Sequence, residues 1–303
     1  MAPQSPVPAS VAADEHDEAT HRGERANRDL RLAGLAVSQV VGRLQSGYRR
    51  DAPWAVASVA RLRREAGRDA YVSPGSWGLV HLETLAELRE TQRMAEQEAR
   101  GAGRAAPAYL TSSGYLSRED QERREDNGVH LAVTLWALHQ QSLRDAPMHV
   151  PGWPLGRAVR RLAHGGTGTH DGGTTRGTDT DRAPDAESDA ATARPASVEE
   201  ADGPVRKRFV RVGNASDIEV LATRLRELVL LLRSSRIPLD YARLADHLTR
   251  WQDENARDEI RRIWGRDFHR RYRAVPDSTP GEEQSPAETP LASHLDEAED
   301  GGF

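Results

Sequence analysis

The stretch IEVLATRLRELVLLLRSSRIPLDYARLADHLTRW, residues 218–251, decides the fold class of the chain. Its apolar side chains recur at alternating spacings of three and four residues, the period at which an α-helix returns to one face. The segment from Ser234 to Pro238 interrupts the pattern, because proline cannot donate the backbone hydrogen bond that a helix interior requires. We therefore predict two consecutive helices, each with one buried face. Their apolar positions are Ile218, Leu221, Leu225, Leu228, Leu232, Leu244, Leu248 and Trp251.

The same helical period appears on both sides of this stretch, and no alternating strand pattern of useful length accompanies it. Val205, Phe209 and Val212 follow it upstream, and Ile260 and Phe268 follow it downstream. We predict an all-α protein in which two small helical bundles are joined by a long disordered linker. Further helices are expected over residues 29–44, 51–67, 73–99, 128–143 and 153–163.

Composition sets the boundaries of these regions. Hydrophobic residues make up 37% of the chain and aromatic residues 5%, so part of it is expected not to fold. Residues 164–203 are rich in Gly, Thr and Asp, which is typical of a low-complexity linker. The predicted regions are a disordered N-terminal tail (1–28), an N-terminal helical region (29–163) with a surface insertion at about 100–125, the linker (164–203), a C-terminal helical bundle (204–273) and a disordered acidic tail (274–303).

Short polar side chains at predicted helix starts indicate N-caps. Asp51 is expected to cap the helix that contains Pro53, and Ser216 is expected to form a capping box with Glu219 three residues later. Three aspartates lie among the arginines of the C-terminal region, and we interpret them as ion-pair partners: Asp240, Asp246 and Asp253.

Several classes of protein are excluded or disfavoured. The chain contains no run of about 18 apolar residues, so no transmembrane helix is expected. The N-terminus lacks the basic start and apolar core of a secretory signal. The absence of cysteine excludes disulfides, thiolate metal sites and cysteine nucleophiles. We expect a cytoplasmic protein.

The sequence offers little catalytic chemistry. His130 and His139 are nine residues apart, so they project from different sides of one predicted helix, and no carboxylate pair stands at metal-ligand spacing. The Gly-rich residues 164–173 lack the Gly-Lys-Ser/Thr end of a phosphate loop. No nucleophile is accompanied by a base and an orienting group. We therefore expect no enzymatic activity, no metal and no cofactor.

Charge is segregated along the chain, although the net charge is only −5. Residues 204–273 contain seventeen Lys and Arg against ten Asp and Glu, a balance of +7. The tail over residues 274–303 contains eight Asp and Glu and no Lys or Arg, a balance of −8. A basic folded region beside acidic tracts carries more information about partners than the total does.

The densest block of positive charge is GPVRKRFVRV, residues 203–212, which contains no acidic residue. Uncompensated positive charge on a helix is repulsive unless a polyanion neutralises it, so either a nucleic acid or an acidic protein is expected to bind there. By contrast, Arg257 and Arg262 have acidic neighbours and are interpreted as ion-paired. The basic cluster around the linker comprises Arg157, Arg160, Arg161, Arg206, Lys207, Arg208, Arg211, Arg224, Arg226 and Arg233.

Several stretches resemble one known family. They are LRELVLLLRSSRIPLDYARLADHLTRW, WALHQQS, PLGRAVRRL and RKRFVRV, together with VARLRREAG and IWGRDFHRRYR. These stretches resemble the CasB family, the small subunit of Cascade, which is the type I-E CRISPR surveillance complex. The resemblance covers both helical regions and leaves out the N-terminal tail, the linker and the acidic tail.

The resemblance implies a small all-helical protein without enzymatic activity, which pairs with a second copy beside the guide RNA and contacts other Cascade subunits. Its basic faces would hold backbone phosphates of the target and displaced strands of the R-loop. By the resemblance, Arg208 matches the family's basic position before an aromatic residue, and Arg226 matches a basic residue in the following helix. The nucleic-acid-binding residues expected on these grounds are Arg63, Arg64, Arg157, Arg206, Lys207, Arg208, Arg211 and Arg226.

The chain departs from the family pattern at two places where some members have basic residues. Asn214 follows the basic helix, and Asp253 and Glu254 follow Trp251, so phosphate contacts at those places are in doubt. Two other interpretations remain open. The chain could be a helical scaffold whose arginines meet acidic protein partners without touching nucleic acid, or an adaptor whose acidic tail is the functional part.

Overall fold

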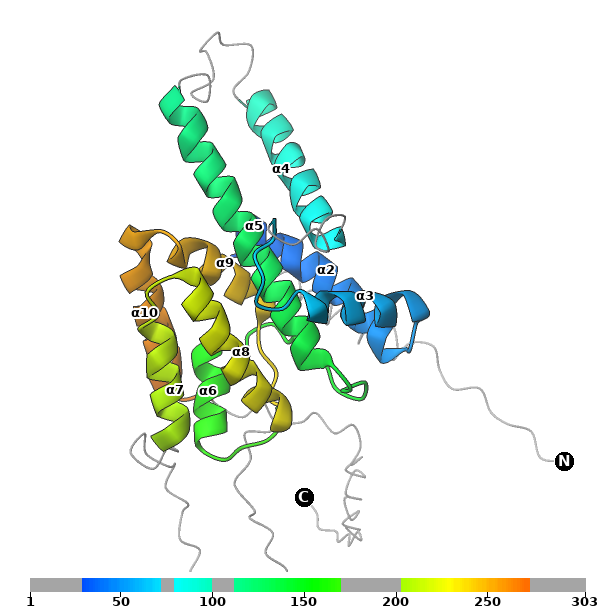
Figure 1. The fold of residues 1–303 in the computed structure, drawn as a ribbon, viewed down its shortest axis with the longest axis vertical. Helices are drawn as coiled ribbons and strands as arrows, with labels where there is room; N and C mark the ends of the chain where they lie inside the picture. Colours follow the sequence, from blue (N-terminus) through cyan, green and yellow to red (C-terminus); the bar gives the residue numbers. More distant parts are fainter. Residues whose placement is uncertain (1–28, 72–78, 100–111, 170–202, 273–303) are drawn as a thin grey trace, which may run out of the picture.

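The computed structural model describes residues 29–71, 79–99, 112–169 and 203–272, and the regular structure within these ranges is helical (Figure 1). This confirms the predicted all-α class. The two predicted tails, and the linker from residue 170 to residue 202, lie outside the described residues. The helices are α2 (Leu32–Arg49), α3 (Pro53–Arg64), α4 (Val80–Ala99), α5 (Ser112–Gln140), α6 (Leu155–Ala163), α7 (Gly203–Gly213), α8 (Ile218–Ser234), α9 (Tyr241–Trp251) and α10 (Glu254–His269).

Helix α9 is the centre of the fold, because almost every one of its side chains is buried. It packs against α2 and α5 from the N-terminal region and against α10 from the C-terminal region. Gly128 allows α5 to approach closely, since a Cβ atom at that position would clash with Thr249 of α9. One hydrophobic cluster therefore extends through all of these helices.

The buried carboxylate of Asp246 on α9 caps the N-terminus of α2. It accepts hydrogen bonds from the backbone N–H of Arg31 at 2.8 Å and of Gly34 at 2.6 Å. A Cβ atom at Gly34 would lie 2.6 Å from the carboxylate, so glycine is needed for this approach. Burial raises the pKa of Asp246, while the two backbone hydrogen bonds oppose the rise because they favour the charged form.

Two loops, one from each side of the linker, pair beside this cap. His149 and Leu239 form an isolated parallel β-bridge. Next to it, the N–H of Asp240 donates to the carbonyl of Trp153 at 2.7 Å, and the side chain of Asp240 accepts from the N–H of Gly152 at 2.9 Å. The connection between α5 and α6 is thereby fixed to the connection between α8 and α9.

The division into two bundles is unconfirmed, because the helices on the two sides of the linker pack together. Helix α6 precedes the linker but packs on α10 and α7, whereas α9 follows the linker and packs on α2 and α5. The shared hydrophobic cluster runs without interruption from one set of helices to the other. The chain positions its C-terminal helices through contacts with N-terminal ones.

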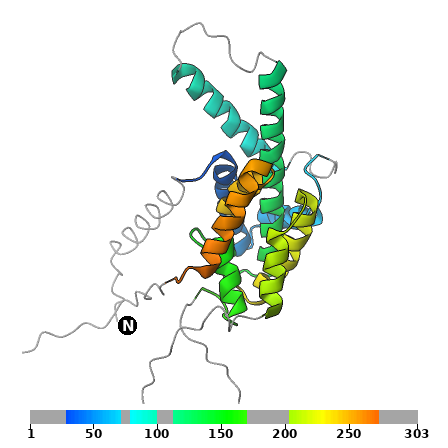
Figure 2. The same cartoon turned by 90° about the vertical axis from the view of Figure 1, so that its left-hand side faces the viewer.

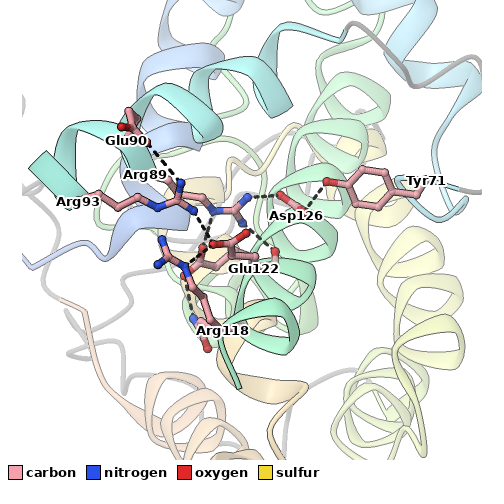
Figure 3. A network of polar contacts seen from close by, with 9 residues as sticks. Tyr71, Arg89, Glu90, Arg93, Arg118, Glu122 and Asp126 are labelled. Atoms are coloured by element: carbon pink, nitrogen blue, oxygen red, sulfur yellow. Dashed lines mark hydrogen bonds and ion pairs between the residues drawn. The ribbon is translucent and has the colours of Figure 1, made fainter. Parts of the chain in front are cut away.

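Helices α4 and α5 extend beyond the body of the molecule as a two-helix arm (Figures 1 and 2). Figure 3 shows the polar network that joins them. The guanidinium of Arg89 lies 2.8 Å from Asp126 and 2.9 Å from Glu125. Glu122 accepts from Arg93 and Arg118, and these hydrogen bonds hold its pKa below the usual value although partial burial opposes them.

The N-terminal half of α5 falls within the predicted insertion. Residues 100–111 lie outside the described residues, but the chain is helical from Ser112 onward, so the helix begins well before residue 128, where the apolar period starts. The charged segment 117–127 has no apolar period, so its helical structure was missed. Ion pairs within one turn and the contacts with α4 stabilise it instead, for example Arg118–Glu122 at 2.9 Å.

Several cap and ion-pair predictions need correction. Helix α8 is capped by Asp217, which accepts from Val220 N–H at 2.7 Å, while the hydroxyl of Ser216 donates to that carboxylate, so the predicted capping box is wrong. Asp51 does not cap α3; it lies in a turn with φ 59° and pairs with Arg144.

The three aspartates predicted to be ion-pair partners act mainly as caps. Asp240 caps its own helix α9, and Asp246 caps α2, so the ion-pair interpretation is wrong for both. Asp253 caps α10 through the N–H of Asn255 and also lies 3.6 Å from Arg124, so the interpretation is confirmed there.

Among the described helices, none combines the length and hydropathy that crossing a bilayer requires.

The Asp246 cap gives a test of the fold. Asp246→Ala leaves two backbone N–H groups without an acceptor, so we expect the free energy of unfolding to fall by about 1–3 kcal/mol in urea titrations. Asp246→Asn retains one acceptor oxygen and should cost less. Asp217→Ala, which removes an exposed cap whose donors can bind water, is the matched control and should have a smaller effect. Equal stability of Asp246→Ala and the parent chain would contradict the assigned role.

Candidate nucleic-acid interface

Helix α7 presents the opening basic stretch as an amphipathic helix. Val205 and Val212 are buried and Phe209 is half-buried, as the spacing predicts. The charged side chains are exposed, with Arg206 at the edge of the apolar groove described below. None of them has an ion pair or side-chain hydrogen bond with any described residue. These four residues, Arg206, Lys207, Arg208 and Arg211, are called the basic face of α7 below.

Two arginines from other helices hold the C-terminus of α7. Arg224 on α8 donates to the carbonyl of Arg211, and Arg261 on α10 donates to the carbonyl of Gly213 at 2.6 Å. Both cations lie where the helix dipole favours positive charge and where backbone carbonyls lack intrahelical donors. The basic face is thus carried by a helix with a fixed position.

An apolar groove of about 280 Å³ separates α7 from α10. Phe209 and Phe268 stack across it, with ring centroids 5.4 Å apart. Val210 lines the groove and is 52% exposed. Figure 2 looks onto the side of the molecule where these two helices lie. The groove-lining residues are Arg206, Phe209, Val210, Gly213, Asn214, Arg261, Trp264, Gly265, Phe268 and His269.

Most of the other predicted basic residues around the linker make internal contacts. Arg160 donates to the carbonyl of Phe268, Arg161 to that of Gly168 and Arg233 to that of Gln141. The guanidinium of Arg157 lies 4.0 Å from the ring centroid of Trp153 and 4.5 Å from that of Tyr272. These arginines stabilise the packing of α6 and α8, and a phosphate contact by Arg157 stays a prediction.

The remaining predicted residues are exposed but not contiguous. Arg226 lies on the outer side of α8, which packs against α7. Arg63 and Arg64 lie at the C-terminal end of α3, which packs on α2 and α5 and is on the other side of the body from α7 (Figure 1). Arg224, two residues earlier, is the residue of α8 that reaches α7, so Arg226 faces another side of that helix. Arg226 and the pair Arg63 and Arg64 therefore lie apart from the basic face.

Comparison with known proteins fits this architecture. Residues 58–269 match the family model of CRISPR-associated protein Cse2. This range begins within α3 and ends at the last residue of α10. The chain belongs to the Cse2 (CasB) family.

Two solved structures match this chain. The crystal structure of CasB from Thermobifida fusca shares 35% sequence identity over 80% of this chain and 100% of that chain, with a TM-score of 0.53. A Cse2-family CRISPR-associated protein from Thermus thermophilus shares 19% identity over 78% of this chain and 97% of that chain, with a TM-score of 0.41. A search of curated proteins found no match.

The two histidines considered as ligands or bases, His130 and His139, have structural partners in this Cse2-family chain. His130 Nδ1 lies 3.0 Å from His81 Nε2, and His139 Nδ1 lies 2.9 Å from the hydroxyl of Tyr241. Burial lowers the pKa of His139 to about 3, so its ring is neutral near pH 7. In the described ranges, no group of three or more His, Asp or Glu side chains is arranged to hold a metal ion.

Two features of the interface were missed by sequence reasoning. The groove between α7 and α10 arises from the packing of helices that are more than forty residues apart in the chain, so no local pattern indicates it. The role of Arg261 was also missed, because its acceptor at Gly213 comes from another helix. Phe209 and Phe268 were the sequence signal that could have indicated the groove, because the helical period predicts a buried face for each of them.

The interpretation of Arg257 and Arg262 as ion-paired needs correction. Arg257 stacks over Trp251 at 4.3 Å and donates to the carbonyls of Trp251 and Ser216. Within the described chain, Asp258 pairs with Arg261, and Arg262 has no ion pair. The prediction failed because sequence proximity indicates which charges are near one another but not which side chains turn inward.

Inward-directed and exposed arginines should therefore differ in how much their replacement lowers stability. Arg257→Ala removes a ring contact and two hydrogen bonds, so the free energy of unfolding should fall by roughly 1–2 kcal/mol. Arg208→Ala removes an exposed side chain without a partner, and the change should stay within about 0.5 kcal/mol. Urea denaturation of both variants measures the contrast. A loss at Arg208 as large as that at Arg257 would mean that the basic face is structural.

Proposed function

We propose that this chain is the non-catalytic small subunit of a type I-E CRISPR RNA-guided surveillance complex, Cascade, and that it holds nucleic-acid backbone through the basic face of α7. The contacted phosphates would belong to the target and displaced strands of the R-loop, near the guide RNA. The chain would act beside a second copy and other Cascade subunits. The observation that carries the proposal is a helix held by neighbouring arginines, with four exposed cations that have no acidic partner among the described residues, in a chain of the Cse2 family.

The basic face suits phosphate binding without sequence readout. Lys207, Arg208 and Arg211 lie at helical spacings of three and four, so their side chains project from one side of α7. Contacts of this kind give affinity and position, whereas bases specify sequence. In RNA-guided recognition, exchange of a DNA duplex for a heteroduplex is nearly balanced, so a few protein–backbone contacts can tip it.

The local aromatic residues favour electrostatic tracking over base stacking. Phe209 and Phe268 stack on each other and face the groove, so neither ring is presented beside the basic face as a free platform. Every nucleotide carries a phosphate, and this is the group that a surface of Arg and Lys binds most readily. We treat Arg226 on α8, and Arg63 and Arg64 on α3, as contacts separate from the basic face.

A protein partner is the second candidate, and one observation favours it. Val210 is 52% exposed and Leu230 is 41% exposed, beside the basic residues of α7 and α8. An interface core is typically apolar with a polar rim. In this scaffold function, the arginines would meet an acidic neighbouring subunit and nucleic acid would not be contacted.

Salt-dependent binding of single-stranded DNA tests the main proposal. The logarithm of affinity falls with the logarithm of salt concentration by about 0.7 per phosphate contact for single strands. Arg208→Ala combined with Arg211→Ala should therefore lower the magnitude of the slope by roughly 1.4, equally for different sequences. The helix should persist because alanine has a higher helix propensity than arginine.

The control is Arg93→Ala with Arg123→Ala, which removes two cations that are ion-paired on the α4–α5 arm. It should leave the slope nearly unchanged. In the assembled complex, the α7 variant should load guide RNA normally and form a less stable R-loop. An unchanged salt slope with defective subunit assembly would instead support the scaffold function.

A further inference from the structure

The last helix before the acidic tail, α10, lines a groove together with α7. The last described residue, Tyr272, is fixed by its ring contact with Arg157 and by its hydroxyl group, which lies 3.4 Å from Asp267. Just before it, Phe268 and His269 line the groove that separates α10 from α7. The tail therefore follows, within a few residues, the helix that faces α7 across this groove.

The tail has the charge and length to cover that face. Residues 274–303 contain eight Asp and Glu and no Lys or Arg. A chain of thirty residues has a root-mean-square span of roughly 30 Å if flexible, and the eleven residues of α7 extend over about 16 Å. Tethering gives the acidic groups an effective concentration near α7 in the millimolar range.

We propose that residues 274–303 dock on the basic face of α7 in the free subunit and occupy the surface that binds phosphates in the complex. The carboxylates of the tail would neutralise Arg206, Lys207, Arg208 and Arg211, which have no partner among the described residues. The interaction is electrostatic and screened, so it holds the face at low salt and yields to a polyanion of higher charge density.

The tail is favoured over the other acidic segment, the linker before α7. Residues 164–203 contain Arg176, Arg182 and Arg194 among their acids, so the linker partly neutralises itself. The tail contains no Lys or Arg and follows α10, the helix that lines the groove together with α7. The tail also lies beyond residues 58–269, which match the Cse2 family model, so this docking belongs to the present chain and is not implied by the family match.

Docking would reduce binding of stray nucleic acid to the free subunit, although the basic face does not read bases. A phosphate-binding face attracts any nucleic acid, because backbone contacts carry no sequence information. A tethered competitor lowers the affinity of the free subunit for stray strands, and strands presented at high local concentration in the complex displace it. This consequence rests on the proposed function, whereas the docking itself does not.

The chain offers a direct probe, because Lys207 is its only lysine and lies within the basic face. A zero-length carbodiimide reagent joins an amine to a carboxylate that touches it. In the full-length protein at low salt, we expect Lys207 to become linked to the tail. Trypsin releases residues 274–303 as one peptide, since they contain no Lys or Arg, so mass spectrometry identifies the product as this peptide joined to Lys207-Arg208.

Two triple variants provide matched arms. Replacement of Arg206, Arg208 and Arg211 by Gln should lower the yield of the Lys207–tail product several-fold. Replacement of Arg61, Arg63 and Arg64 by Gln removes three exposed arginines from α3, away from α7, and should leave the yield unchanged. The yield should also fall with added salt, because the Debye length shortens from about 10 Å at 0.1 M to about 3 Å at 1 M.

The proposal would be overturned if no product with the tail formed, or if products were confined to Glu199, Glu200 and Asp202 just before α7. It would also be overturned if the yield of the tail product did not change when the α7 charges are removed. A mixture of heavy-isotope-labelled and unlabelled protein separates docking within one chain from docking between chains, and a product formed only between chains would also contradict it.

A second measurement separates this proposal from the proposed function. Replacement of the eight acids of the tail by Asn and Gln should tighten single-stranded DNA binding at low salt by roughly threefold to tenfold, because the tethered competitor is lost. Tail cross-linking without DNA binding in either protein would support docking and refute the nucleic-acid function. DNA binding that is lost in the α7 variant but unaffected by the tail, with no cross-link, would refute docking alone.

Discussion

The structure depends on the burial of α9, a helix with polar groups on several sides. Asp246 accepts two backbone hydrogen bonds at the start of α2, His247 accepts from Trp264 of α10 at 3.0 Å, and Tyr241 contacts His139 of α5. Burying such groups without partners would cost several kcal/mol. Because the partners come from both sides of the linker, α9 is satisfied only when the N-terminal and C-terminal helices fold together.

This constraint fixes the position of the candidate interface. Helix α9 packs on α10, α10 packs on α6, and α6 packs on α7. The described arginines of the C-terminal helices include two contrasting groups. Those directed inward, such as Arg224, Arg257 and Arg261, donate to backbone carbonyls and hold helices in place. Those on the outer side of α7 and α8 have no described partner, so their charge is available to a polyanion.

A net charge of −5 conceals this arrangement. Many of the acidic residues lie outside the described helices, and α7 itself contains none. Within the described body, acidic side chains cap helices or pair with arginines of the α4–α5 arm, as Asp126 does with Arg89. The folded body can therefore present a positive surface although the whole chain is acidic, and long-range attraction of a polyanion depends on that local field.

The sequence by itself determined the all-helical class, the apolar faces of α7 and α8, and the absence of any acid from the basic stretch, because helical period and local charge depend only on neighbouring residues. It did not determine that Asp246 caps a helix more than two hundred residues away, or that Arg257 stacks on Trp251. It also gave no sign of the helical charged start of α5, which depends on ion pairs and contacts with α4 and not on an apolar period. Tertiary structure alone decided which arginines turn inward and which stay exposed, because that choice depends on the carbonyls and rings that other helices bring to each position.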